Sequence, residues 1–261
     1  MLLRRTHFLM RERDEVIQRR GRELVELVAR RLPMDVDVTE DGGWPAAASA
    51  LVCRMTATMV SILDLQKSER ESEAGTLARS LYEHAVYFAW LAADPPRHIE
   101  EWRKDDLNAR LKADREMTER GIPLLGDATR AAFKQDEATM QGKRLNIADL
   151  AIIADAYWAG RLPGMGAQTT LLSFRGMYAS LYRLYSGMAH PTVRGLNRAY
   201  DDIGGTLRRV RLEGPYEGNG PYGLATFVFA LALYASGQSI GWPSEQDVTG
   251  VFVRHPDPRA S

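Results

Sequence analysis

Arg79, Glu83 and His84 are ionisable residues inside an almost entirely apolar stretch, LARSLYEHAVYFAWLAAD, which runs from residue 77 to residue 94. Arg79 and Glu83 are four residues apart, so on a helix they share a face and can form an ion pair. Burying either charge alone would cost several kcal/mol. An arginine has five N–H donors, more than one carboxylate can accept. We therefore expect a buried Arg79–Glu83 pair that also reaches a second helix.

The best partner for this pair is the segment YASLYRLYSGMAHP, residues 178–191. Tyr178, Tyr182 and Tyr185 recur there at spacings of four and three, which makes an aromatic stripe on a helix. Ser186 and His190 are four apart near the end of that helix, where the helix dipole favours a charged histidine. The sequence therefore predicts one polar cluster between two central helices.

This cluster has two interpretations: a buried network that fixes helix register, or a catalytic or ligand-binding site. In an enzyme acting on a small molecule, Glu83 or His190 would be the general base. The pocket would be lined by Tyr82, Tyr182 and Trp90, because Trp90 falls about 20° from Arg79 on a helical wheel. The candidate catalytic residues are Arg79, Glu83, His84 and His190, and the candidate ligand-binding residues are Tyr82, Trp90, Tyr182, Ser186 and Arg194.

A local excess of arginine lies beside His190. Residues 171–211 hold seven arginines against two aspartates. Such a stretch can form a phosphate-binding surface for RNA or for a small phosphorylated ligand. The same arginines can equally pair with acids elsewhere in the chain.

The composition excludes several classes of protein. The 261 residues have a formal net charge of zero, so the whole molecule has no strong non-specific attraction to nucleic acid. The one cysteine, Cys53, cannot form an intrachain disulfide, which fits a cytoplasmic protein. The N-terminus has no apolar run typical of a signal peptide, and the apolar run from Leu224 to Gly237 is shorter than a membrane span. We expect no membrane association.

No cofactor is expected. The chain has no C-x-x-C, H-E-x-x-H or E-x-x-H motif of the kind that binds zinc or a di-iron centre. GNGPYG, residues 218–223, matches G-x-G-x-x-G but follows no apolar strand, so we expect a turn-rich loop.

The periodicity of apolar residues predicts a single all-α domain, a bundle of about seven to nine helices. Residues 206–214, TLRRVRLEG, are the one stretch expected to be a short strand or an extended linker. The bundle should span residues 1–241, with segments 69–93 and 169–190 as the central pair, and residues 242–261 should form an irregular C-terminal arm. The expected helices are 13–32, 45–65, 69–93, 95–121, 127–144, 146–158, 169–190 and one from 224 onward.

Two of these segments resemble a known family. ARSLYEHAVYFAWLAAD and YSGMAHP are similar to the signature blocks of the family called domain of unknown function 5677. The resemblance covers roughly residues 50 to 200, and it implies an all-helical fold without an established activity. The matching positions are Arg79, Glu83, Ser186, His190 and Pro191.

The segment RSLYEH also resembles the R-x4-H spacing of HEPN domains. That resemblance implies a metal-independent ribonuclease of a toxin or phage-defence system, in which Arg79 and His84 from two protomers act at a dimer interface. On one helix, residues five apart point about 140° away from each other.

Three functions therefore stay open: a binding or regulatory module, a HEPN-like ribonuclease, and an enzyme acting on a small molecule. We also expect a homodimer, because the aromatic and apolar surface exceeds what one bundle core needs.

Overall fold

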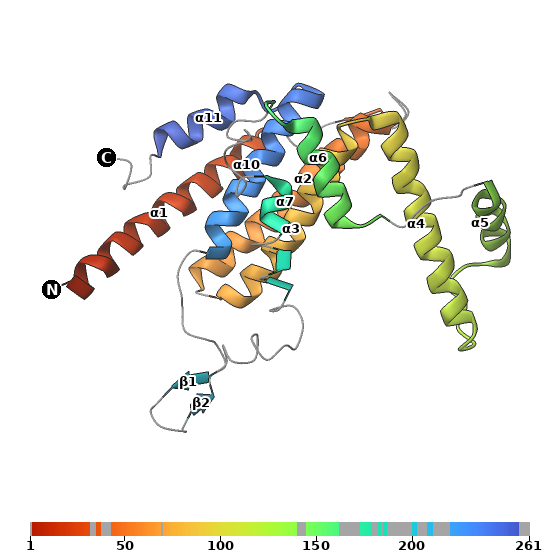
Figure 1. Cartoon of the computed structure of the whole chain (residues 1–261), viewed down its shortest axis with the longest axis horizontal. Helices are drawn as coiled ribbons and strands as arrows, with labels where there is room; N and C mark the ends of the chain where they lie inside the picture. The colour runs from red at the N-terminus through yellow and green to blue at the C-terminus, as the bar shows by residue number, and fades with distance from the viewer. Residues whose placement is uncertain are drawn as a thin grey trace.

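The structure is a computed structural model. It describes residues 2–31, 35–37, 43–68, 70–139, 145–161, 173–178, 182–183, 185–186, 200–202, 208–210 and 220–255, with backbone alone at 2–14, 136–139 and in the two strands. The described chain is a helical bundle, so the predicted all-α fold is confirmed (Figure 1). The helices are α1 (Leu2–Ala29), α2 (Trp44–Lys67), α3 (Glu71–Leu91), α4 (Pro95–Thr118), α5 (Asp127–Thr139), α6 (Ile147–Trp158), α7 (Phe174–Met177), α10 (Gly220–Ile240) and α11 (Glu245–Arg254).

One small antiparallel sheet lies outside the helical body (Figure 1). It pairs β1 (Tyr200–Asp202) with β2 (Arg208–Val210), so that Tyr200 lies opposite Val210. β2 falls inside residues 206–214, where the sequence predicts a strand or an extended linker.

Helix α3 occupies the centre of the bundle because it has no polar face. Its Leu81, Ala85 and Phe88 side chains are fully buried. α3 packs mainly against α2 and α10, and next against α6. The expected central partner was the segment 169–190, but α10 is apolar on all sides and buries most of its own length against α3 and α2. The described part of residues 169–190 adds Phe174, Met177 and Tyr185 to the same core.

The C-terminal arm differs from the expected irregular segment, because residues 245–254 form α11. Ser244 and Asp247 form a capping box: the Ser244 hydroxyl accepts from the Asp247 amide at 3.2 Å, and the Asp247 carboxylate accepts from the Ser244 amide at 3.2 Å. Val248 and Val251 then bury one face of the helix. The turn before α11 folds tightly onto α10, since a Cβ at Gly237 would collide with the carbonyl oxygen of Pro243.

Helix α10 also begins earlier than expected. Residues 220–223, the second half of the GNGPYG stretch, form its first turn, where Pro221 needs no intrahelical amide bond. Of the described helices, α2 and α10 are long and apolar enough to cross a membrane by length and composition alone, and here both also pack against α3.

Helices α4 and α5 form an arm that projects from the body (Figure 1). The base of the arm is fastened to α3 by His98, whose ring stacks on Trp90 with 4.4 Å between centroids. His98 Nδ1 also donates to the Trp90 carbonyl at 2.6 Å, so it satisfies a backbone group at the end of α3.

Candidate functional site

Arg79 of α3 makes the contacts that the sequence predicts. Its Nε donates to Glu83 Oε1 at 3.2 Å, and its Nη2 donates to the Tyr182 hydroxyl at 3.1 Å. The guanidinium carbon also lies 4.5 Å from the centroid of the Tyr182 ring, within the range of a cation–π interaction. The ion pair and its contact with a second segment are both confirmed.

This pair is not buried as expected. The Arg79 and Glu83 side chains are 21% and 35% exposed, because their face of α3 looks toward the edge of the bundle. Among the described residues, Arg79 uses two of its five N–H donors. The remaining donors belong to a guanidinium that is oriented by Glu83 and Tyr182 and still reaches solvent.

Two other tyrosine rings, one stacked and one tilted, hold Tyr182 in place. The rings of Tyr178 and Tyr182 lie 4.9 Å apart with 16° between their planes. Tyr82 of α3 contacts the same ring from below the surface, at 6.1 Å between centroids. Of the predicted aromatic stripe, Tyr182 therefore lies against Arg79 with Tyr178 stacked on it, whereas Tyr185 is buried in the core.

The segment that carries these tyrosines is anchored at its start by two other helices. Asp155 of α6 accepts from the Phe174 amide at 2.7 Å and from the Arg175 amide at 3.0 Å. Tyr82 donates its hydroxyl hydrogen to the Phe174 carbonyl at 2.7 Å. The first amides and the first carbonyl of α7 thus have partners on α6 and α3. Ser173 adds a local cap by accepting from the Gly176 amide at 2.9 Å.

Sequence reasoning missed Asp155. Its only signal is a lone acid in the otherwise apolar run LAIIADAYW, and its bonds join positions 19 and 20 residues apart. Burial raises the pKa of Asp155, although the bonds from Arg175, Phe174 and Ser173 oppose that shift. Burial also raises the pKa of the Tyr82 hydroxyl well above its ordinary value, so Tyr82 stays a hydrogen-bond donor at neutral pH.

The structure separates Trp90 and His84 from the Arg79 contacts. Trp90 is eleven residues beyond Arg79, which places it about 16 Å farther along α3, against His98. His84 is half-buried, and its Nδ1 donates to the Ser80 carbonyl of its own helix at 2.7 Å. Tyr82 and Trp90 are 0% and 1% exposed. The space around these two rings is therefore filled, and the expected deep pocket between them is absent from the described residues.

The remaining candidates lie near the end of the tyrosine segment. Ser186 is half-buried, whereas Arg175 and Arg183 are exposed to solvent. His190 and Arg194 lie outside the described residues, so their place in the cluster stays a prediction.

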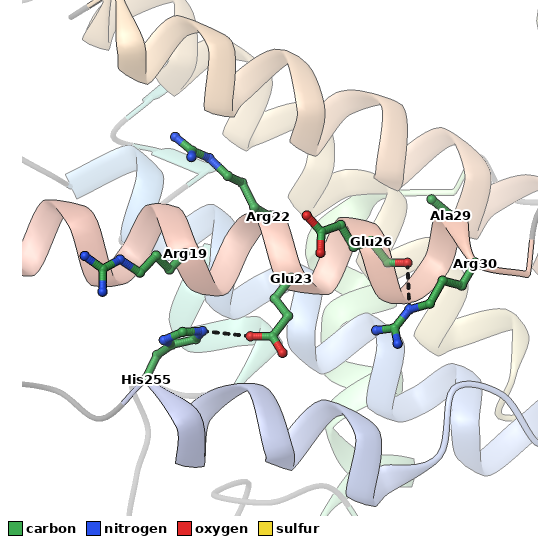
Figure 2. A pocket seen from close by; sticks show the side chains of 7 residues that line it. All are labelled: Arg19, Arg22, Glu23, Glu26, Ala29, Arg30 and His255. Carbon is green, nitrogen blue, oxygen red and sulfur yellow. Dashed lines mark hydrogen bonds and ion pairs between the residues drawn. The ribbon is translucent and has the colours of Figure 1, made fainter.

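A separate polar hollow of about 780 Å³ lies along α1 beside the end of α11 (Figure 2). His255 Nε2 and Glu23 Oε2 are 2.7 Å apart there, and Arg254 bonds the same carboxylate. Burial would raise the pKa of Glu23, but the bonds from Arg254 and His255 lower it. The ionic contacts of Glu23 in this hollow thus fasten the C-terminal helix to α1. No group of three His, Cys, Asp or Glu side chains suited to a metal occurs in the described part of the chain.

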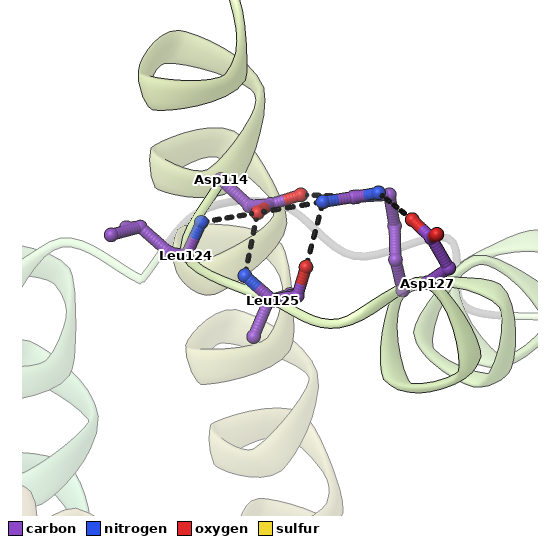
Figure 3. A network of polar contacts seen from close by, with 5 residues as sticks. Asp114, Leu124, Leu125 and Asp127 are labelled. Carbon is purple, nitrogen blue, oxygen red and sulfur yellow. Dashed lines mark hydrogen bonds and ion pairs between the residues drawn. The ribbon is translucent and has the colours of Figure 1, made fainter. Parts of the chain in front are cut away.

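A second ionic network holds the tip of the α4–α5 arm (Figure 3). Asp114 of α4 accepts from the Leu124 and Leu125 amides at 2.9 and 2.8 Å and from Arg130 Nε at 2.6 Å. Arg130 donates to Asp127 at 2.7 Å and to the Leu125 carbonyl at 2.7 Å. The bond from Arg130 is the main reason that the pKa of Asp114 falls to about 2.

The comparisons with known proteins identify a family and nothing further. The model of a family of unknown function, DUF5677, matches residues 46–204. This range holds Arg79, Glu83, Asp155 and Tyr182, and it ends before α10 begins. No curated protein matches the chain, and no solved structure does.

Proposed function

The chain belongs to DUF5677, a family of unknown function, and from its own geometry we propose that it is a binding module that takes a phosphate-bearing ligand at Arg79. The observation that carries this proposal is the state of the Arg79 guanidinium. It is held in one orientation by Glu83 and Tyr182, it reaches solvent, and among the described residues it has unused donors.

Comparison with two other arginines shows what distinguishes this state. Arg97 also pairs with a glutamate one turn away, Glu101, but its side chain is 70% exposed and has no partner on another described element. Arg130 is as exposed as Arg79, yet it makes four hydrogen bonds across the arm. Arg97 is therefore poorly oriented and Arg130 is occupied, whereas Arg79 is both oriented and accessible.

The chemistry of the site favours a phosphate. A planar guanidinium presents its donors in a fork that matches the oxygens of a phosphate or a carboxylate. Arg175 and Arg183 are exposed on the segment that contacts Arg79, so they add positive charge that attracts a multiply charged anion. The half-exposed Glu83 orients Arg79 and leaves the local charge positive.

The same geometry supports binding more than catalysis. Tyr82 stays protonated, and Asp155 already accepts backbone amides. His84 is bonded to its own helix through Nδ1 and makes no contact with Arg79 among the described residues. Glu83 is the one described carboxylate bonded to Arg79, and that bond orients the arginine.

The test is a titration with inorganic pyrophosphate at low ionic strength, with the affinity measured by isothermal titration calorimetry in every variant and the Arg79 Nε–Hε resonance followed by NMR wherever Arg79 is present. We expect a saturable shift in the wild type. Arg79→Gln should weaken binding about ten- to a hundredfold, because a hydrogen bond to a charged group contributes about 1.5–3 kcal/mol. Arg97→Gln is the matched control and should bind as the wild type does. Equal affinity in Arg79→Gln would contradict the proposal.

A parallel incubation with a mixed RNA pool in EDTA separates binding from cleavage. We expect the RNA to stay intact. Cleavage that disappears in His84→Ala or His190→Ala would replace the binding proposal with the ribonuclease alternative.

A further inference from the structure

We propose that Asp155 is the positioning residue of the Arg79 site: it fixes the start of α7, and thereby the place of Tyr182 against Arg79. The effect of Asp155 on ligand binding rests on the proposed function, whereas its effect on the geometry of Arg79 is independent of that function.

The two oxygens of Asp155 set both the height and the rotation of α7. Oδ1 accepts from the Phe174 amide at 2.7 Å, and Oδ2 accepts from the Arg175 amide at 3.0 Å. A single acceptor would leave the segment free to turn about one bond. Two acceptors on successive amides define one orientation, in the way that a cap defines the first turn of a helix.

Tyr82 provides the second anchor from the helix that carries Arg79. Its hydroxyl donates to the Phe174 carbonyl at 2.7 Å and is fully buried. The two peptide groups of Phe174 are thus held from opposite sides, one by α6 and one by α3. Tyr178 follows four residues later and Tyr182 four residues after that, and their rings stack at 4.9 Å. A shift at Phe174 therefore moves the ring that Arg79 contacts.

An ionisable residue at position 155 has a cost that packing alone does not explain. The neighbouring Leu150, Ala151, Ala154 and Trp158 are buried in the core, and α6 packs on both α3 and α7. Burial raises the pKa of Asp155, so the ionised carboxylate is held in surroundings that disfavour it. The hydrogen bonds that Asp155 accepts from the two α7 amides offset this cost.

The experiment compares Asp155→Asn with Asp149→Asn, a substitution of the same kind at an exposed position of the same helix. Asparagine keeps one oxygen for the Phe174 amide but turns an NH₂ group toward the Arg175 amide. We expect an unchanged helical circular dichroism spectrum, faster hydrogen exchange at both amides, and an Arg79 Nε–Hε resonance shifted toward that of a solvated arginine. Pyrophosphate affinity should fall roughly tenfold, about the effect of one charged hydrogen bond. Asp149→Asn should change none of these.

The outcomes separate the two proposals. An unchanged Arg79 resonance in a folded Asp155→Asn variant would overturn the positioning role. A shifted Arg79 resonance in a protein whose wild type binds no pyrophosphate would support the positioning role and remove the proposed function. If Asp155→Asn does not fold, Asp155→Glu keeps the carboxylate but displaces both of its oxygens from the Phe174 and Arg175 amides, and the Arg79 resonance decides in the same way.

Discussion

The α4–α5 junction and the α6–α7 junction use the same two components in different arrangements. In each, an aspartate accepts two successive backbone amides from a later segment of the chain: Asp114 from Leu124 and Leu125, and Asp155 from Phe174 and Arg175. The two arginines to compare, Arg130 and Arg79, have side chains that are each 21% exposed. At the first junction the arginine is bonded to the aspartate. At the second, Arg79 bonds Glu83 and Tyr182 instead.

The difference shows how an architectural arginine can be told from an available one. Arg130 makes four hydrogen bonds, and its bond to the buried Asp114 is the main reason that the pKa of this carboxyl is about 2. Asp155 has no arginine side chain bonded to it among the described residues, so burial dominates and raises its pKa. The number of hydrogen bonds that each side chain makes, more than its exposure or charge, separates Arg130 from Arg79.

The largest expected effect comes from removing Arg130, the arginine with four hydrogen bonds. Arg130→Gln leaves the Asp114 carboxylate buried without its partner, so hydrogen exchange at the Leu124 and Leu125 amides should quicken roughly a hundredfold. Arg79→Gln should lower the free energy of unfolding by less than about 1 kcal/mol, because a half-exposed pair contributes little. Equal losses of thermal stability in the two variants would remove the distinction between them.

An intermediate effect is expected from Tyr82→Phe. This variant leaves the Phe174 carbonyl in the interior without its donor, which should lower the free energy of unfolding by about 1–3 kcal/mol in urea denaturation. Tyr157→Phe is the control, because the half-buried Tyr157 makes ring contacts and no hydroxyl bond among the described residues. A loss as large in the control would show that the hydroxyl of Tyr82 has no special role.

The smallest expected effect is that the pKa shifts of Asp114 and Asp155 have opposite signs. The pKa of Asp114 is depressed, so its contribution to stability is present above its ordinary pKa and is lost as the pH falls through about 2. The pKa of Asp155 is raised, so its contribution is complete below its ordinary pKa and is lost as the pH rises through the folded-state value. NMR titration of the two carboxyl carbons should show the two midpoints on opposite sides of an ordinary aspartate. Shifts in the same direction would refute the comparison.

Much of the fold follows from local patterns in the sequence. The periodic apolar residues of α1 to α6 predict those helices, and the spacing of Arg79 and Glu83 predicts both the ion pair and its reach to Tyr182. The α11 helix was also within reach, because Ser244 and Asp247 have the spacing of a capping box before Val248. It was missed because the segment is short and flanked by prolines.

The rest required three-dimensional information. A helical wheel gives the direction of Trp90 but ignores its height, so it placed on one face a ring about 16 Å away along the axis. Asp155 caps a segment that no local pattern connects to it, since its partners come from another element. The exposure of Arg79 depends on which helices cover α3, and α10 comes from more than 140 residues farther along the chain.

Gly237 couples the two ends of the described chain through a single backbone position. Any side chain there would meet the carbonyl oxygen of Pro243 and push α11 off α10. Helix α11 brings Arg254 and His255 to Glu23 of α1, so one backbone position governs how both ends of the chain are joined. A larger residue at position 237 would therefore disturb the contacts of Glu23, although the two residues are more than 200 positions apart.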